Sequence, residues 1–370
     1  MFPYFLLIFF SLVLPFMMFQ PIGAISESDY AELAQKRSKM TLRTFFLGLF
    51  ILLALRDITV GKDLYTYKII FEQCSVTAFR YLSNMQWELG YTIYNKIVSL
   101  FSANYRLFLA ITSAIILFPM YKLYSREKKY GFLAILLFIN MPCFLMVFSG
   151  LRQAIAISIG ILAYMAVEKK KYLLSALLIL LAMSFHISAF ILVLIYPAFF
   201  LEIKTNHLLY IVPIMAGVYL FRVPIFSFVI GFLPSHYVEF YGELQQTGSV
   251  GMMLLFLLFF VFSFVILDEA SMSKRDYFMR NVLMIATVFQ FFVPIHGLIQ
   301  RASYYFLIFV PISIISVVQA PKKYLKNISN LAVAVIGCFF AVYFFYNAHF
   351  STDNMLDVFP YKFFWSGQGW

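Results

Sequence analysis

The chain alternates between long apolar runs and short polar segments, a pattern typical of membrane-spanning helices. The run that follows Arg152 is almost purely apolar, and so is the run that precedes Ser149. A membrane span requires about 20 apolar residues, or fewer where it is tilted or broken. We therefore predict an all-α polytopic membrane protein with about twelve transmembrane helices. The predicted spans are residues 2–19, 42–55, 105–121, 131–148, 151–167, 172–183, 187–201, 208–221, 251–267, 281–294, 302–318 and 328–346.

Two of the polar segments are long, and both fall on the same side of the predicted spans. Residues 56–104 contain an amphipathic piece near residues 87–101, so we expect this outer loop to lie in the membrane interface or to dip back into the membrane. Residues 222–250 are expected to form a second outer loop or an interfacial helix. The aromatic tail after Tyr346 is expected in the outer interface. No polar stretch is long enough for a soluble domain, so residues 1–370 are predicted to form one integral membrane domain.

The composition agrees with a membrane protein and excludes several kinds of binding site. Hydrophobic residues make up 63% of the chain and charged residues 12%, which excludes an ordinary soluble domain. The net charge of +11 comes from Lys and Arg scattered in short loops, so it does not indicate a nucleic-acid partner. Cys74, Cys143 and Cys338 are far apart, which predicts neither a disulfide framework nor a metal site. There is no glycine-rich nucleotide motif, and we expect no cofactor.

The distribution of Lys and Arg predicts the orientation of the spans. About two thirds of the 28 basic residues follow the odd-numbered spans, and the more basic loops stay in the cytoplasm. Both termini would then be extracytoplasmic, together with segments 56–104 and 222–250. Several predicted spans are short, notably residues 172–183, and short spans usually surround a cavity rather than lipid.

The remaining polar residues gather at span ends on the predicted outer side. Arg152, His186 and Arg301 are each expected to begin a span that runs inward, and Ser184 is a candidate cap for the helix that carries His186. A helix N-terminus presents free backbone N–H groups and the positive end of the helix dipole, which favour an anion. A guanidinium adds a fork that can bind two phosphate oxygens at once. Several such helix starts around one cavity would form a diphosphate site at the depth of the lipid headgroups.

These residues also have ordinary structural interpretations. A lone arginine at a span end is more often an interfacial anchor, although Arg152 lies on the less basic side. His186 could equally be a core histidine with satisfied hydrogen bonds. Other such interpretations are an Arg56–Asp57 ion pair that closes a loop, an interfacial Tyr65, and a Glu88 that merely favours a helix N-terminus.

Short motifs at these span ends resemble those of one family. FSGLRQAIA at residues 148–156 and SFHISA at 184–189 are the most specific. The others are RD at 56–57, VGKDLYTY at 60–67, WELGY at 87–91 and RASYYF at 301–306. The set is similar to that of the EpsG family of bacterial polysaccharide polymerases, which is related in role to the Wzy O-antigen polymerases. Lys62 stands where the family usually has Thr, and Leu89 where it often has Pro.

The resemblance implies a GT-C-type glycosyltransferase of the bacterial cytoplasmic (inner) membrane, active on the periplasmic side. Its substrates would be undecaprenyl-diphosphate-linked oligosaccharides, as in O-antigen (lipopolysaccharide), capsule or exopolysaccharide synthesis. The growing glycan would move from its lipid diphosphate to the non-reducing end of a new lipid-linked repeat unit. Besides this substrate and the lipid bilayer, a chain-length regulator is a candidate partner.

This chemistry assigns roles to the outer polar residues. A leaving diphosphate needs positive charge rather than a general acid, and the candidates to supply it are Arg152, Arg301 and Arg56. The attacking sugar hydroxyl needs a base or an orienting acceptor, for which the candidates are His186, Asp63 and Glu88. We favour His186 as a contact near the reacting centre, with one of the two carboxylates as the base. The expected sugar contacts are Gln153, Asp57, Tyr65 and Tyr304.

Two other membrane functions share some of these features. A flippase for lipid-linked oligosaccharides would carry charged groups through the bilayer midplane, whereas here the span interiors are nearly bare. An outer-face glycan ligase would need the same site chemistry, and only the family resemblance separates it from a polymerase.

Overall fold

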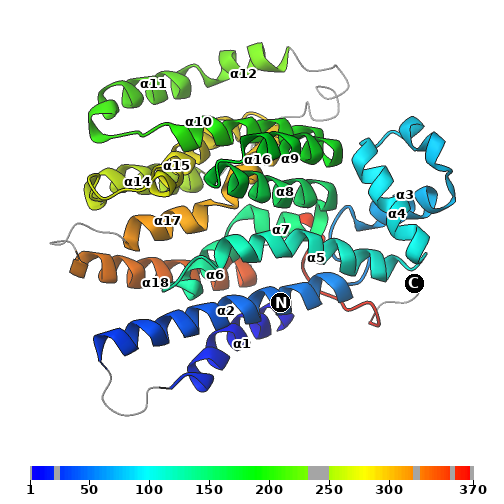
Figure 1. The fold of residues 1–370 in the computed structure, drawn as a ribbon, viewed down its shortest axis with the longest axis horizontal. Coiled ribbons are helices and arrows are strands. Elements are labelled where there is room, and N and C mark those ends of the chain that lie inside the picture. Colours follow the sequence, from blue (N-terminus) through cyan, green and yellow to red (C-terminus); the bar gives the residue numbers. More distant parts are fainter. Residues whose placement is uncertain (1, 21–25, 232–249, 320–325, 351–354, 367–370) are drawn as a thin grey trace. The chain divides into compact units, whose positions relative to one another are not determined.

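The computed structural model describes residues 2–20, 26–231, 250–319, 326–350 and 355–366. Within these ranges the regular structure is helical, and the β-type pairing is a single isolated bridge between Arg56 and Phe363. A helix satisfies its own backbone hydrogen bonds away from water, which is why apolar runs adopt it in lipid. The prediction of an all-α polytopic membrane protein is confirmed (Figure 1).

The helices fall into two compact units. The first comprises residues 1–190 and 336–370, and the second comprises residues 191–335. The first contains α1 (Phe2–Met18), α2 (Glu27–Leu55), α3 (Leu64–Val76), η1 (Phe79–Asn84), α4 (Leu89–Phe101), α5 (Tyr105–Tyr124), α6 (Gly131–Ile139), α7 (Pro142–Ser149), α8 (Leu151–Glu168), α9 (Tyr172–Phe185) and η5 (Met355–Asp357). The second contains α10 (Ile195–Phe200), η3 (Thr205–His207), α11 (Leu208–Leu220), α12 (Arg222–Ile230), α14 (Val250–Ile266), α15 (Lys274–Phe292), α16 (Gly297–Leu307) and α17 (Val310–Gln319). The ends of η2 (Ile187–Leu194) and α18 (Lys326–Phe350) fall in different units.

Helix α8 forms the core of the first unit. It packs against α5 on one side and α9 on another, while α2 packs against α1, α5 and α6 (Figure 1). Small residues recur along α8, including Ala154, Ala156, Gly160 and Ala163. Small side chains let neighbouring helices approach closely, so α8 is buried along most of its length. This burial holds its first turn, which carries Arg152, in a defined place.

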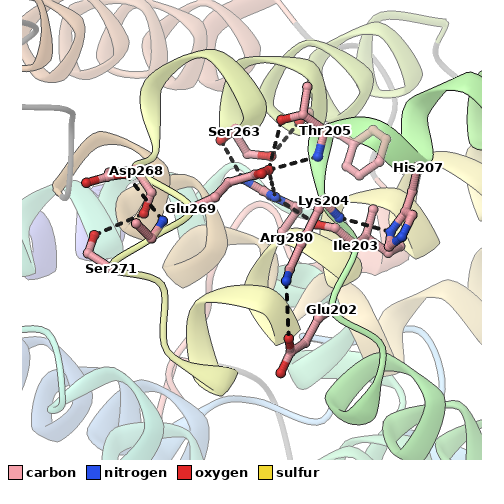
Figure 2. Close-up of polar contacts among 12 residues, drawn as sticks. Glu202, Ile203, Lys204, Thr205, His207, Ser263, Asp268, Glu269, Ser271 and Arg280 are labelled. Atoms are coloured by element: carbon pink, nitrogen blue, oxygen red, sulfur yellow. Dashed lines mark hydrogen bonds and ion pairs between the residues drawn. The ribbon is translucent and has the colours of Figure 1, made fainter.

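Helix α15 forms the corresponding centre of the second unit, and it contacts α10, α14, α16 and α17. In the sequence, Arg280 of this helix is only one more basic residue on the predicted cytoplasmic side, yet its side chain is fully buried. Figure 2 shows that its guanidinium donates to Ile203 O (2.8 Å), Glu269 Oε1 (2.9 Å) and Ser263 O (2.8 Å). Thr205 donates to the same Glu269 oxygen from its N–H and its hydroxyl. Arg280 therefore ties two interhelical connections to α15.

Every predicted span coincides with helical residues, but the number of spans stays a prediction. In the described part of the chain, four helices are long and apolar enough to cross a membrane, or up to seven if each bent pair is one span. The four are Ser28–Leu55, Tyr105–Tyr124, Leu151–Glu168 and Asn330–Asn347. The bent pairs are α6 with α7 (68°), η3–α11 with α12 (71°) and α16 with α17 (47°). Several other predicted spans are apolar helices of 10–17 residues.

The structure corrects one expectation about the polar segments and adds detail to two others. Helix α2 begins at Glu27, so the basic segment before residue 42 is helical rather than a loop. The first outer loop, residues 56–104, contains three helices, and its predicted amphipathic piece is α4. In the second, residues 222–230 form α12, while residues 232–249 lie outside the described part of the chain.

Candidate functional site

Three helix ends meet at Glu88 in the first unit. Glu88 is the N-cap residue of α4, Arg152 is the second residue of α8, and His186 is the C-cap residue of α9. Arg152 Nη1 donates a hydrogen bond to Glu88 Oε2. The other oxygen, Oε1, lies 3.2 Å from His186 Nδ1 and 3.4 Å from the N–H of Ile187. One carboxylate thus joins an arginine and a histidine that are distant from it in sequence.

The charged group of Arg152 also rests on aromatic side chains. Its guanidinium lies 4.6 Å from the centroid of the Trp87 ring, within range of a cation–π interaction. Tyr67 makes a side-chain hydrogen bond to it. The side chains of Glu88, Arg152 and His186 are each between 15% and 20% exposed, so the cluster is shielded without being sealed. Arg152 combines a guanidinium with a helix N-terminus, as predicted, and both attract anions.

Two glycines allow these segments to approach one another. A Cβ on Gly90, in the first turn of α4, would lie 2.1 Å from Ser184 Oγ near the end of α9. A Cβ on Gly61 would lie 2.4 Å from the carbonyl oxygen of Phe148, and Gly61 has φ +117°, where a side chain is strained. The two glycines therefore let α4 contact α9, and let the segment after α2 contact the end of α7.

The environment of Glu88 keeps its carboxylate charged. Burial by itself would raise the pKa of Glu88, but the hydrogen bond with His186 and the positive charge of Arg152 outweigh it and lower the pKa to about 2. A carboxylate with this pKa is a weak base at neutral pH. The geometry suits it better to orient Arg152 and His186 than to accept a proton.

The segment between α2 and α3 carries the other two acidic candidates. Asp63 is the N-cap residue of α3, its N–H donates to Ser149 Oγ (3.3 Å), and its side chain makes no capping hydrogen bond. Asp57 is buried, and its Oδ1 accepts hydrogen bonds from the N–H and the hydroxyl of Thr59. The described residues contain no Arg56–Asp57 ion pair, which was the ordinary interpretation of that dipeptide.

Arg56 is the most unusual of the candidate arginines. The residue is 1% exposed, and none of its three guanidinium nitrogens has a hydrogen-bond partner among the described residues. Its guanidinium lies 5.7 Å from the centroid of the Phe148 ring. Burial lowers the pKa of Arg56 to about 10, so the group remains charged at neutral pH. Burying a cation whose N–H donors have no acceptor costs free energy. Such a group is able to bind an anion, which would supply the missing acceptors.

The predicted sugar contacts have contrasting environments. Gln153 is buried next to Arg152, whereas Tyr65 is 64% exposed on α3. Tyr304 is buried in the second unit, where Arg301 also lies.

Two expectations about helix ends are corrected. Arg301 does not begin a helix: α16 is capped by His296, whose Nδ1 accepts from the N–H of Leu298, and Arg301 follows one turn later. Ser184 does not cap the helix after His186, because its hydroxyl donates to the carbonyl oxygen of Leu181. Both errors have the same cause: an apolar run predicts that a span is present, but it does not predict the residue at which the helix begins.

Sequence reasoning missed the contacts that Trp87 and Tyr67 make with Arg152. Trp87 directly precedes Glu88, so its position beside a charged residue was the available signal. Tyr67 gave no such signal, because its approach to Arg152 depends on how α3 packs against α4.

Comparison with known proteins gave one match. A model of the EpsG family matches residues 39–363, which include the whole Glu88 cluster and the segment between α2 and α3. No curated protein and no solved structure matches the chain.

Proposed function

Since the chain belongs to the EpsG family, we propose that this polysaccharide polymerase-like membrane protein is a GT-C-type glycosyltransferase with a lipid-diphosphate-linked donor. It moves a growing glycan from undecaprenyl diphosphate to a hydroxyl of a new lipid-linked repeat unit. The reaction takes place on the periplasmic side of the inner membrane, as in O-antigen or capsule synthesis. The observation that carries the proposal is the cluster of Glu88, Arg152 and His186 at three helix ends.

Arg152 stabilises the leaving diphosphate in this proposal. The bond between the sugar and the diphosphate breaks, and negative charge develops on the diphosphate oxygens. Arg152 uses one nitrogen to bind Glu88, and a guanidinium has five N–H donors, so others can bind phosphate oxygens. The N-terminus of α8 adds its dipole to the same place. Arg56 and Arg301 are the further candidates for this role.

His186 takes the proton from the attacking sugar hydroxyl. Its Nδ1 faces Glu88, and a proton on Nδ1 leaves Nε2 with the lone pair that a base requires. A carboxylate that orients a histidine in this way is a recurring device in general base catalysis. Glu88 is then a positioning residue, and Asp63 is the second candidate for the base. The attacking oxygen forms the new glycosidic bond as the bond to the diphosphate breaks.

The test is polymerisation by the purified full-length protein in liposomes that contain lipid-linked repeat units. Arg152→Ala should lower the rate of chain growth by about 10²–10³-fold, since a charge-stabilising donor is lost. Arg152→Lys should recover only part of it, because lysine keeps the charge but lacks the fork. His186→Gln should cost about 10²-fold or more. Arg80→Ala, which removes an exposed arginine of the segment before α4, is the matched control and should polymerise normally.

A normal ladder of polymer lengths from Arg152→Ala would overturn the site assignment. Transbilayer movement of the repeat units by the wild-type protein, without chain growth, would replace the polymerase by a flippase. If Asp63→Asn abolishes chain growth while His186→Gln preserves it, Asp63 rather than His186 is the base.

A further inference from the structure

The C-terminal segment of residues 355–366, called here the C-terminal strap, returns to the segment that follows α2. The partner segment consists of Leu55, the last residue of α2, and residues 56–63, which are called the α2–α3 connection. Backbone hydrogen bonds join the two at both ends: Gly61 N to Asp357 O (2.9 Å), Lys62 N to Leu356 O (2.8 Å), Asp57 N to Lys362 O (2.9 Å) and Phe364 N to Leu55 O (3.0 Å). These bonds satisfy backbone donors that no helix supplies with a partner. The strap is therefore part of the packed first unit.

Side chains anchor the strap to three helices. The Tyr361 hydroxyl donates to Leu52 O in α2 (2.8 Å), and the Tyr4 hydroxyl of α1 donates to Val358 O (2.9 Å). Val358 is fully buried. The guanidinium of Arg106 in α5 lies 3.7 Å from the centroid of the Phe364 ring. The strap is thus held at several points along its length.

The α2–α3 connection is held on its other side by the residues that precede Arg152. Gly61 lies against the carbonyl oxygen of Phe148, and the N–H of Asp63 donates to Ser149 Oγ. The connection therefore lies between the strap and the end of α7. It carries Arg56 at one end and Asp63 at the other, and two residues separate Ser149 from Arg152.

We propose that the C-terminal strap is a positioning element for glycosyl transfer, and that it fixes the place of Asp63 relative to the cluster of Glu88, Arg152 and His186. The inference rests on the proposed function. The α2–α3 connection has no regular structure of its own, and the N–H groups of Asp57, Gly61 and Lys62 all have acceptors in the strap. Loosening the strap frees this connection and moves Asp63 away from its place, while Arg152, Glu88 and His186 keep their mutual contacts.

The experiment replaces one anchoring tyrosine at a time by phenylalanine, which removes the hydroxyl and its hydrogen bond but keeps the aromatic ring. Tyr4→Phe and Tyr361→Phe, made in the full-length chain, should each lower kcat for chain growth by about 3–10-fold, with KM for the lipid-linked repeat unit unchanged within about twofold. The expectation follows because Arg152, Glu88 and His186 are untouched and only the position of Asp63, the second candidate for the base, is relaxed. Tyr30→Phe, at an exposed tyrosine of α2, is the matched control and should behave as wild type.

A double-mutant cycle separates positioning from general destabilisation. In an Asp63→Asn chain, the strap substitutions should cause no further loss of kcat, since they act through Asp63. The inference is wrong if the fold-loss of kcat from a strap substitution multiplies fully with the fold-loss from Asp63→Asn in the double variant. It is also wrong if neither Tyr4→Phe nor Tyr361→Phe lowers kcat by itself. The proposed function fails in a different way, namely if wild-type protein does not extend glycans or if Arg152→Ala extends them normally.

Discussion

At the scale of single residues, Glu88 is the group on which the candidate site depends. Its two oxygens contact Arg152 and His186, and the resulting pKa of about 2 lies well below the ordinary value of 4.5. A folded-state pKa that is lowered stabilises the folded protein above the ordinary pKa. This contribution is complete above about pH 4.5 and is lost as the pH falls toward 2.

Glu88→Gln should therefore destabilise the protein in a pH-dependent manner. At pH 7 the loss should be about 1–3 kcal/mol, because Arg152 loses a charged partner in a partly buried place. At pH 3 the difference from wild type should narrow, since the wild-type carboxylate begins to take up a proton. Thermal unfolding in detergent at both pH values measures this.

The control for this prediction is Glu72→Gln, at an exposed carboxylate whose distance from Lys68 is 3.9 Å. It should change stability by less than about 0.5 kcal/mol at either pH. A deficit of Glu88→Gln that is equal at pH 7 and pH 3 would show that charge is not what stabilises the cluster.

At the scale of elements, the close crossing of α4 and α9 brings Glu88 and His186 together. Gly90 lies at this crossing, and its lack of a side chain allows the approach to Ser184. Gly217 in α11 offers a contrast, because a Cβ there would meet nothing within 4 Å. The two glycines therefore test whether packing or helix propensity determines the effect of a substitution.

Gly90→Ala should destabilise the protein by about 1–3 kcal/mol, since the added methyl group overpacks the crossing. Gly217→Ala should be neutral or stabilising by up to about 1 kcal/mol, since alanine favours a helix and nothing is displaced. Denaturant or thermal unfolding of the two variants checks both signs. Equal effects at the two positions would contradict the packing argument.

At the scale of the whole molecule, the distribution of basic residues predicts which face lies in the cytoplasm. The same rule predicts that Arg152, His186 and the α2–α3 connection lie outside, where a lipid-linked glycan would be extended. The rule depends on charge alone, so labelling from one side of the membrane can check it independently of the candidate chemistry.

Single cysteines at Arg80 and Lys169 should label from opposite sides. In a Cys338→Ser chain, Arg80→Cys should react with an impermeant maleimide in intact spheroplasts, whereas Lys169→Cys should react only after permeabilisation. Both positions are exposed, and the two remaining native cysteines are buried. The reverse pattern would place the candidate site in the cytoplasm and remove the lipid-linked glycan as its substrate.

The sequence by itself determined the properties that depend on local hydropathy. Long apolar runs specified helices because the lipid interior leaves the backbone no other partners, and short motifs around residues 148–156 and 184–189 indicated the family. The expectation that Arg152 begins a helix was also local, and it is confirmed.

Only the tertiary structure decided which polar groups meet. Glu88 has its partners 64 and 98 residues away, and the C-terminal strap meets a segment some 300 residues earlier, so no local pattern specifies either contact. In the sequence Arg280 is only a positive charge near a span end, and Arg56 is a candidate for the diphosphate site. Both are buried, Arg280 with three acceptors and Arg56 with none among the described residues. The hydropathy of a segment determines whether it forms a buried helix. Which charged side chains come together, in surroundings of low dielectric constant, is determined by how the ends of different helices pack.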